Sequence, residues 1–254
     1  MFLASILATS SKTVRGIGRK LERSLKRRGV AGTLKFFALN IPSIVRDLAP
    51  SRRQAKSAQS EYDRKFNVNT SGEIHLSDLD IASPNSAFGN SYEPSPPKII
   101  NEMIAALDIR YQDFTFIDIG SGKGLVLLIA STYPFRKIIG VEFSPELNRV
   151  AKENIRNYQN SEQQCNDIQL VLRDVTEYVW PSDPLVLYMF NPFNEKIVQT
   201  LVTRIRESLE AHPRPLFILY KNPVANRVFE EGNFLKTVRF SKAYAIYEFK
   251  GSGV

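Results

Sequence analysis

The part of the sequence best suited to bind a ligand is a glycine-rich stretch near the middle of the chain. It reads FIDIGSGKG over residues 116–124 and begins in an apolar run typical of a β-strand. Glycines let the backbone turn tightly and approach a ligand closely, and the free N–H groups at the start of the following helix can bind an anion or a carboxylate. The stretch therefore predicts a ligand-binding loop between a strand and a helix.

Two known nucleotide-binding motifs fit this loop incompletely. The phosphate-binding loop of nucleotide hydrolases has four residues between its glycines and then Gly-Lys-Ser or Gly-Lys-Thr, so it is excluded. The dinucleotide fingerprint is G-x-G-x-x-G, whereas Gly120, Gly122 and Gly124 are evenly spaced and Asp118 lies two residues before the first of them. That fingerprint is weakened but leaves a nicotinamide-dependent oxidoreductase as an open alternative.

Polar side chains also stand at the ends of three later strand candidates. Glu142, Asp174 and Asn191 each come at or just after the end of an apolar run. If the strands are parallel, their carboxyl ends lie at one edge of the sheet, where ligands bind in open α/β sheets. Taken singly, each residue could instead be a helix cap, a loop acid or part of a strand-ending turn.

The order and spacing of the loop and these strand ends resemble class I S-adenosylmethionine-dependent methyltransferases. The loop matches motif I of that family, D-x-G-x-G-x-G, and the later strand ends follow in the family's order over about residues 92–250. The resemblance implies a doubly wound, Rossmann-like domain. It also implies that the chain binds S-adenosylmethionine as its cofactor and transfers the methyl group to an acceptor.

The same resemblance implies a role for each residue. Asp118 would hold the loop and the cofactor's amino group, Glu142 would accept both ribose hydroxyls, and Asp174 would bind the adenine amino group. Phe143 would pack on the adenine. The remaining predicted cofactor-binding residues belong to the loop, whose glycines would cradle the methionine part: Gly120, Ser121, Gly122 and Gly124.

A short segment upstream of the loop carries a second resemblance. Residues 92–95 read YEPS, similar to the Y-x-P-S element of a group of bacterial methyltransferases and of relatives of the lysine methyltransferase that modifies the ATP synthase c subunit. In that group the segment folds over the cofactor, so Tyr92 is predicted to close the site from above. The alternative is a proline-rich linker whose tyrosine only packs.

The end of the fourth strand candidate departs from the ATP synthase enzymes. Residues 191–193 read NPF, which partly resembles the N-P-P-Y motif of methyltransferases that act on planar amino groups. In those enzymes the Asn and Pro carbonyls accept the amine protons, so Asn191 is the candidate catalytic residue and nitrogen the favoured acceptor atom. Tyr220, at the end of the fifth strand candidate, is predicted to point toward the same cleft.

Alternating strand and helix patterns must position these residues. Helical spacing is expected at 97–107, 125–132, 145–158, 195–211 and 225–231, and strands at 114–119, 137–141, 168–172, 185–190, 216–220, 235–240 and 244–249. Strands that alternate with helices imply a parallel sheet covered on both faces. The last two strands are too close for a crossover, so the sequence predicts a doubly wound, mostly parallel seven-stranded α/β sheet with one antiparallel member.

Basic charge is concentrated before this domain. Residues 1–60 hold 13 of the 34 Lys and Arg side chains but only 2 of the 26 acids, so the rest of the chain is slightly acidic. Apolar residues at helical spacing among basic ones over residues 12–28 predict a cationic amphipathic helix. The predicted organisation is a basic helical extension over 1–60, a linker over 61–91 and a methyltransferase domain over 92–254.

That helix could lie on an anionic membrane surface, contact nucleic acid, act as a targeting peptide, or simply pack on the domain. A cofactor-binding scaffold held at a membrane by residues 12–28 is therefore the non-enzymatic alternative. A slightly acidic body argues against a nucleic-acid acceptor, so a protein or small molecule is favoured. The protein is expected in the cytoplasm, either free or bound at the membrane surface, and the mitochondrial matrix is the alternative.

Composition excludes several other classes. The chain has 254 residues and 43% apolar content, enough for a folded core. One cysteine and two histidines supply neither a disulfide framework nor a zinc site, so no metal is predicted. Uncharged runs such as residues 124–135 are too short to cross a bilayer as a helix.

Overall fold

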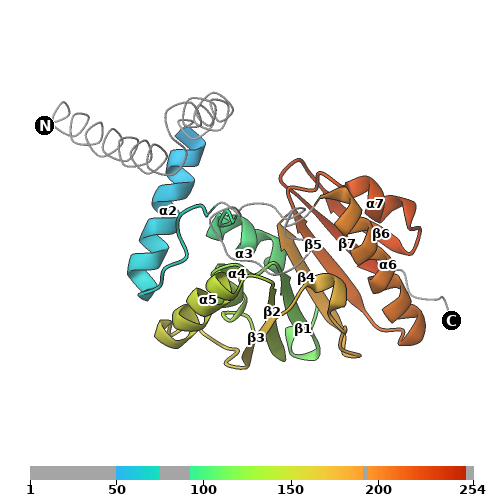
Figure 1. Ribbon diagram of the computed structural model, residues 1–254, viewed down its shortest axis with the longest axis horizontal. Helices are drawn as coiled ribbons and strands as arrows, with labels where there is room; N and C mark the ends of the chain where they lie inside the picture. Colours follow the sequence, from blue (N-terminus) through green and yellow to red (C-terminus); the bar gives the residue numbers. More distant parts are fainter. Residues whose placement is uncertain (1–49, 75–91, 191–193, 250–254) are drawn as a thin grey trace, which may run out of the picture. The chain divides into compact units, whose positions relative to one another are not determined.

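The computed structural model describes residues 50–74, 92–190 and 194–249 (Figure 1). The chain divides into two compact units, Met1–Ala55 and Lys56–Val254. Of the first unit the structure describes only residues 50–55, which form the start of helix α2 (Pro50–Phe66). The amphipathic helix predicted over residues 12–28 lies outside the described residues. The second unit contains the sheet and includes residues 61–74 of the predicted linker.

The second unit is built on one sheet of seven strands in the order β3-β2-β1-β4-β5-β7-β6 (Figure 1). All neighbouring strands are parallel except β7, which runs antiparallel to both β5 and β6. This arrangement confirms the predicted doubly wound, mostly parallel sheet of the class I methyltransferase type. The strands are β1 (Thr115–Ile119), β2 (Lys137–Glu142), β3 (Ile168–Leu172), β4 (Leu185–Phe190), β5 (Leu216–Lys221), β6 (Leu235–Phe240) and β7 (Tyr244–Phe249).

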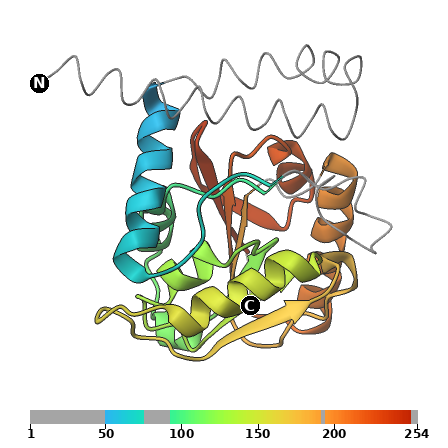
Figure 2. The same ribbon diagram turned by 60° about the vertical axis from the view of Figure 1, so that its left-hand side comes forward.

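Helices cover both faces because successive strand residues point to opposite sides. In β1, Phe116 belongs to the buried cluster that includes Leu127 and Met103 of the helices on one face, whereas Ile117 belongs to the cluster that includes Leu201 on the other. Figure 2 shows α5 crossing in front of the strands. One face carries α3 (Pro97–Ala105), α4 (Leu125–Ala130) and α5 (Pro145–Asn157), and the other carries α6 (Glu195–Ala211) and α7 (Asn226–Glu231).

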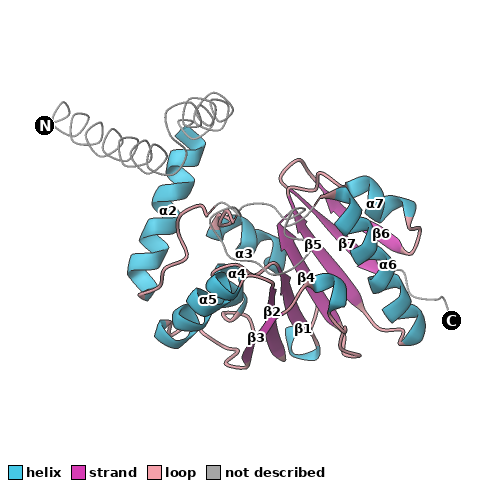
Figure 3. Cartoon of the chain, viewed as in Figure 1, coloured by secondary structure: helices cyan, strands magenta, loops and turns pink. Residues whose placement is uncertain are grey.

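The starts of the helices follow from the sequence between strand and helix, and Figure 3 shows the alternation. Ser144 caps α5 by accepting the Leu147 N–H at 3.3 Å, and Pro145 occupies the first turn. Asn194 caps α6 in the same way, through the Ile197 N–H at 3.1 Å. Short loops between each strand and its helix place the strand ends at one edge of the sheet. The described part of the unit also contains the single-turn 3-10 helices η3 (Tyr111–Asp113) and η4 (Val175–Glu177).

Helix α4 is buried over its whole length, as its nearly continuous apolar sequence predicts. It packs against the sheet and against α3, where it contributes to the larger of the two core clusters on that side. In the described part of the chain, no helix combines the length and the apolar character that a membrane span requires.

Candidate functional site

The glycine-rich stretch forms the predicted loop between β1 and α4. Its three glycines adopt positive φ angles, 73° at Gly120, 53° at Gly122 and 85° at Gly124. The N–H groups of Gly120 and Ser121 donate to the Val141 carbonyl at 2.9 and 3.1 Å, which fastens the loop to β2. The left-handed conformation at all three positions is one that other residues rarely adopt, so the spacing of the motif is explained by the backbone path.

Asp118 lies in β1 just before this loop and is almost completely buried, with 2% of its surface exposed. Its Oδ2 accepts no hydrogen bond from any described residue. Burial, and secondarily the neighbouring charge of Glu142, hold the pKa of this carboxyl well above its usual range. A buried carboxyl oxygen without a donor is costly, and such groups often mark a place that a ligand occupies.

Glu142 ends β2 and faces the loop. Its Oε2 accepts the Gly122 N–H at 2.8 Å, and its Oε1 accepts the Ser144 N–H at 2.9 Å. Burial raises the pKa of the Glu142 carboxyl, while these backbone hydrogen bonds act in the opposite direction. Both carboxylate oxygens therefore stand at the carboxyl edge of the sheet, and each keeps lone pairs for a further donor.

Tyr92 lies directly against the loop, and its role in closing the cofactor site from above stays a prediction. A Cβ added to Gly122 would come within 2.4 Å of the Tyr92 ring, so the ring occupies the space beside that glycine. The Tyr92 hydroxyl donates to the Thr70 carbonyl at 2.6 Å, and its backbone forms an antiparallel bridge with Ile74. In Figure 2 the chain that follows α2 runs beside the segment that leads into α3.

A buried hydrogen bond fixes the segment after Tyr92 on the sheet. The hydroxyls of Ser95 and Tyr188 lie 2.7 Å apart, and both residues are buried. Tyr188 in β4 is the register partner of Asp118, so this bond anchors residues 92–96 beside the site. Burial is also the main reason that the pKa of the Tyr188 hydroxyl is raised.

We expect Tyr188→Phe to lower the free energy of unfolding by about 1–3 kcal/mol, because the Ser95 hydroxyl would stay buried without its partner. Urea unfolding measures the loss. Adding Ser95→Ala should recover part of it, since no orphaned hydroxyl then remains. A double variant less stable than Tyr188→Phe would contradict this interpretation.

Phe143 and Asp174 complete the predicted adenine side. Phe143 follows Glu142 and is half-buried. The Arg173 N–H donates to the Glu142 carbonyl at 2.9 Å, which brings Asp174 next to the end of β2. Asp174 Oδ1 caps η4 by accepting from the Thr176 N–H and hydroxyl at 2.9 and 2.7 Å. Asp174 therefore does cap a helix, which was the alternative interpretation of this residue, and its binding of adenine stays a prediction.

Two predictions on the acceptor side have different outcomes. Asn191 lies outside the described residues, so its role stays a prediction. The prediction for Tyr220 is wrong, because this side chain is fully buried and its ring packs on Phe229 with centroids 5.2 Å apart. Its hydroxyl accepts the Ala225 N–H at 3.3 Å. Tyr220 belongs to the core between β5 and α7 and not to a cleft.

Comparisons with known proteins find only distant structural similarities. No protein-family model and no curated protein matches the chain. Among solved structures, a putative S-adenosylmethionine-dependent methyltransferase from Methanococcus maripaludis is 18% identical with a TM-score of 0.47, covering 62% of this chain and 86% of that one. An RNA methyltransferase from Salinibacter ruber, in complex with S-adenosylhomocysteine, is 18% identical with a TM-score of 0.42, covering 62% and 92%.

A magnesium protoporphyrin IX methyltransferase from Synechocystis, with bound S-adenosylmethionine, is 11% identical with a TM-score of 0.43, covering 59% of this chain and 75% of that one. Similarity as weak as this assigns neither a substrate nor a residue role to the chain. The site must therefore be interpreted from its own geometry.

The end of β5, the strand next to β4, carries a residue that sequence analysis missed. Lys221 ends β5 with 8% of its surface exposed, and its Nζ lies 3.1 Å from the centroid of the Phe190 ring at the end of β4. Because Phe190 directly precedes residues 191–193, this cation–π pair borders the predicted acceptor side. Nothing in the sequence marks Lys221 except its position one residue after Tyr220.

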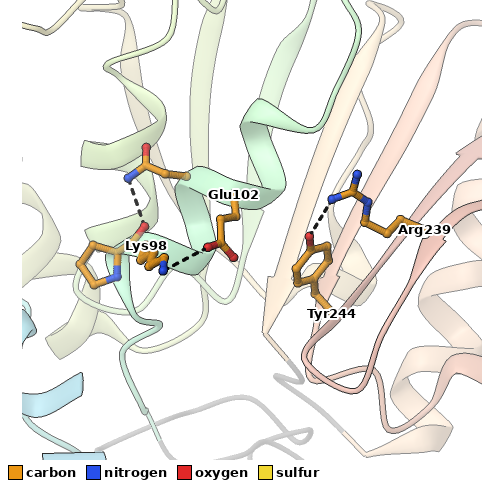
Figure 4. Close-up of polar contacts among 6 residues, drawn as sticks. Lys98, Glu102, Arg239 and Tyr244 are labelled. Atoms are coloured by element: carbon orange, nitrogen blue, oxygen red, sulfur yellow. Dashed lines mark hydrogen bonds and ion pairs between the residues drawn. The ribbon is translucent and has the colours of Figure 1, made fainter. Parts of the chain in front are cut away.

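More exposed polar pairs lie farther along the same side of the sheet (Figure 4). Arg239 Nη1 donates to the Tyr244 hydroxyl at 3.2 Å, and Lys98 and Glu102 form an ion pair at 3.8 Å on α3. Tyr244 is the register partner of Lys221, so the Arg239–Tyr244 pair lies beside the end of β5. Exposed pairs of this kind contribute about 0–1 kcal/mol, so they shape the surface more than they stabilise it.

Two buried polar residues beside the glycine loop were also missed. Lys123 lies inside the motif with 6% of its surface exposed, and Asn154 lies in α5 with 2% exposed. A signal for Asn154 did exist, because it shares the buried face of α5 with Leu147 and Ala151 at helical spacing. A polar residue in an apolar stripe needs a buried partner, and here the partner is the loop.

Proposed function

We propose that this chain binds S-adenosylmethionine at the carboxyl edge of β1 and β2 and transfers its methyl group to an acceptor. The observation that carries the proposal is the pair of buried carboxyl groups beside a positive-φ glycine loop. Asp118 Oδ2 has no donor among the described residues, and Glu142 spans the Gly122 and Ser144 amides. Two buried acids placed in this way fit a ligand that brings a cation and hydroxyl donors.

The residues present fit this cofactor. Asp118 would accept from its ammonium group, Glu142 from its ribose hydroxyls, and the backbone beside Gly122 allows close approach. When bound, S-adenosylmethionine supplies a methyl group that is already activated by the positively charged sulfur. The task of the protein is then mainly to bind, orient and exclude water.

The acceptor is proposed to be a nitrogen on a protein or a small molecule. The support is the NPF sequence at residues 191–193, whose Asn191 carbonyl would orient the amine, and the slightly acidic composition of the chain after residue 60. Phe190 and Lys221 would border the acceptor. Incubation with tritiated cofactor and separated protein, small-molecule and RNA fractions of a cell extract tests this. Label found only in RNA would contradict the proposal.

Cofactor binding is expected to weaken as the pH falls. The loss of affinity should begin at a pH above the range in which carboxyl groups usually titrate. The pKa of both Asp118 and Glu142 is raised, so protons enter the site early and remove the acceptors and the negative charge. For the same reason, binding should release protons at any pH where these carboxyl groups are still partly protonated in the ligand-free protein. Calorimetric titrations in buffers of different ionisation enthalpy measure this release.

Glu142→Gln supplies the matched variant for this experiment. Because this variant has one titrating carboxyl group fewer, its affinity should depend less steeply on pH than that of the wild-type protein. The Glu142 charge also helps to raise the Asp118 pKa, so the remaining decrease in affinity should occur at lower pH. An affinity that does not change with pH in the wild-type protein, at pH values where it stays folded, would show that neither carboxyl group contacts the ligand.

A further inference from the structure

The residues that follow α2 form an ordered segment over the glycine loop. Residues 67–74, called the clasp below, begin where Asn67 adopts a φ of 54° and turns the chain back from the helix. The last residue of α2, Phe66, is buried against Leu128 and Tyr158, with the Phe66 and Tyr158 rings 5.3 Å apart. The end of α2 is thus anchored on α4 and α5, and the clasp starts from a fixed point.

The carboxylate of Asp63 organises the clasp from within α2. It accepts the Thr70 N–H at 2.9 Å, the Thr70 hydroxyl at 2.6 Å and the Ser71 N–H at 2.8 Å. Gln59 adds a bond from its Nε2 to Thr70 Oγ1 at 2.6 Å. Thr70 is completely buried as a result. Hydrogen bonds to a carboxylate are the stronger kind, so this turn has one defined conformation.

Asn154 joins the clasp to the glycine loop. Its Oδ1 accepts the Asn69 N–H at 2.7 Å, and its Nδ2 donates to the Asn69 carbonyl at 3.1 Å. The same Nδ2 donates to the Lys123 carbonyl at 2.8 Å. One amide side chain therefore fixes the backbone of both segments, and Lys123 stands between Gly122 and Gly124, two of the three positive-φ glycines of the loop.

The Lys123 side chain forms a second connection between the clasp and the glycine loop. Its Nζ donates to the Ser71 carbonyl at 2.7 Å and lies 3.4 Å from Asn69 Oδ1. Burial lowers the pKa of this ammonium group, and the charge of Asp63 acts in the opposite direction. The clasp thus holds the ammonium group of Lys123, and Asn154 holds its backbone carbonyl.

Tyr92 contacts both the clasp and the glycine loop. Its hydroxyl reaches the Thr70 carbonyl of the clasp, while its ring fills the space beside Gly122. The Lys123 Nζ also lies 5.5 Å from the centroid of this ring. The clasp and Tyr92 therefore contact both of the residues at the centre of the loop.

We propose that the clasp is part of the cofactor site, with Lys123 and Asn154 as positioning residues that hold the glycine loop in its binding conformation. A segment with three glycines has many accessible conformations, and ordering it on binding would lower the affinity. Contacts that order the loop beforehand remove this cost. The identity of the ligand in this proposal rests on the proposed function. The ordering of the loop by the clasp does not depend on it.

The test uses the full chain and two variants, Lys123→Met and Asn154→Leu, which keep the side-chain size and remove the hydrogen bonds. Two readouts are measured: the Kd for S-adenosylhomocysteine by calorimetry, and hydrogen exchange of the peptide over residues 119–127 without ligand. Each variant is expected to bind about 10-fold more weakly, the effect of losing one or two buried hydrogen bonds. The peptide should exchange faster in both.

Arg214→Met is the matched control. Arg214 is a buried cation that donates to two backbone carbonyls, those of Ser208 at 2.9 Å and His212 at 2.7 Å, in the connection between α6 and β5. Its replacement removes the same type of interaction as Lys123→Met but does not touch the loop. Affinity and exchange of residues 119–127 should stay at their wild-type values.

If Asn154→Leu does not fold, Lys123→Met carries the test alone, because it removes the bond to the Ser71 carbonyl and leaves the hydrogen bonds of Asn154 to the backbone in place. Wild-type affinity and wild-type exchange in the Lys123 and Asn154 variants would overturn the proposal. Equal losses in Arg214→Met would overturn it too, since the effect would then be one of general stability. If the wild-type chain does not bind S-adenosylhomocysteine, the proposed function fails, and the exchange comparison alone decides whether the clasp orders the loop.

Discussion

Asp118→Asn is expected to make the ligand-free protein more stable and at the same time to weaken cofactor binding strongly. The folded protein must either bury the charge of Asp118 or take up a proton there, because Oδ2 has no donor among the residues described and the pKa is raised. A neutral amide of the same shape avoids this cost. Sites that are destabilised in this way are characteristic of binding and catalysis.

The sign and pH dependence of the stability change follow from linkage. A carboxyl group whose pKa is higher in the folded state than in the unfolded state favours folding least above its folded pKa. The gain in stability of Asp118→Asn should therefore be small in acid, grow as the pH rises through the usual carboxyl range, and level off above the raised pKa. Thermal unfolding of both proteins at several pH values measures it, with roughly 2–4 °C per kcal/mol for a domain of this size.

The loss of binding has a separate cause. In Asp118→Asn, the ammonium group of the ligand meets a neutral amide instead of a carboxylate and loses a charge-assisted hydrogen bond, on the order of a 10- to 100-fold loss of affinity. Asp63→Asn is the contrasting variant, because Asp63 accepts hydrogen bonds from three donor groups and its replacement should destabilise the protein. A destabilised Asp118→Asn protein with wild-type affinity would contradict the assignment of this residue.

Gly122→Ala is expected to abolish measurable cofactor binding. The φ of 53° disfavours any side chain, and the added Cβ would lie 2.4 Å from the Tyr92 ring, so the loop or the ring must move. Backbone strain of this kind costs about 1–3 kcal/mol, and the displacement affects the backbone that approaches the ligand. Calorimetry gives the affinity, and urea unfolding gives the stability.

Gly72→Ala provides the control for backbone strain. Gly72 has a φ of 87° but no heavy atom within 4 Å of an added Cβ. In urea unfolding it should therefore show the conformational cost without the collision, and the difference in unfolding free energy between the two variants isolates the contact with Tyr92. Because Gly72 belongs to the clasp, only the stabilities of these two variants are compared, and not their affinities. If Gly122→Ala binds the cofactor as tightly as the wild-type protein, the glycine loop is not the binding site.

Much of the fold could be predicted because its signals are local. The apolar run of α4, the strand that ends at Glu142 and the short gap before β7 each appear within a few residues, and each is confirmed. The spacing of the glycines and of Asp118 and Glu142 likewise predicted which residues meet at the edge of the sheet.

The features that sequence analysis missed depend on contacts between distant residues. Asn69 and Asn154 are 85 positions apart, and no periodic pattern connects a polar turn with a helix. The error for Tyr220 has another cause. Alternation along β5 decides which face a side chain joins, and a position near the strand end does not reveal that Phe229 and α7 already cover that face.

Calorimetric titration of the purified full chain tests the central claim most directly, with S-adenosylmethionine, S-adenosylhomocysteine and NADH added separately at one salt concentration. The site described by Asp118, Glu142 and the glycine loop predicts Kd values in the micromolar range for the first two ligands and no binding of NADH. Binding of NADH alone, or no binding of any of the three by a folded sample, would contradict it.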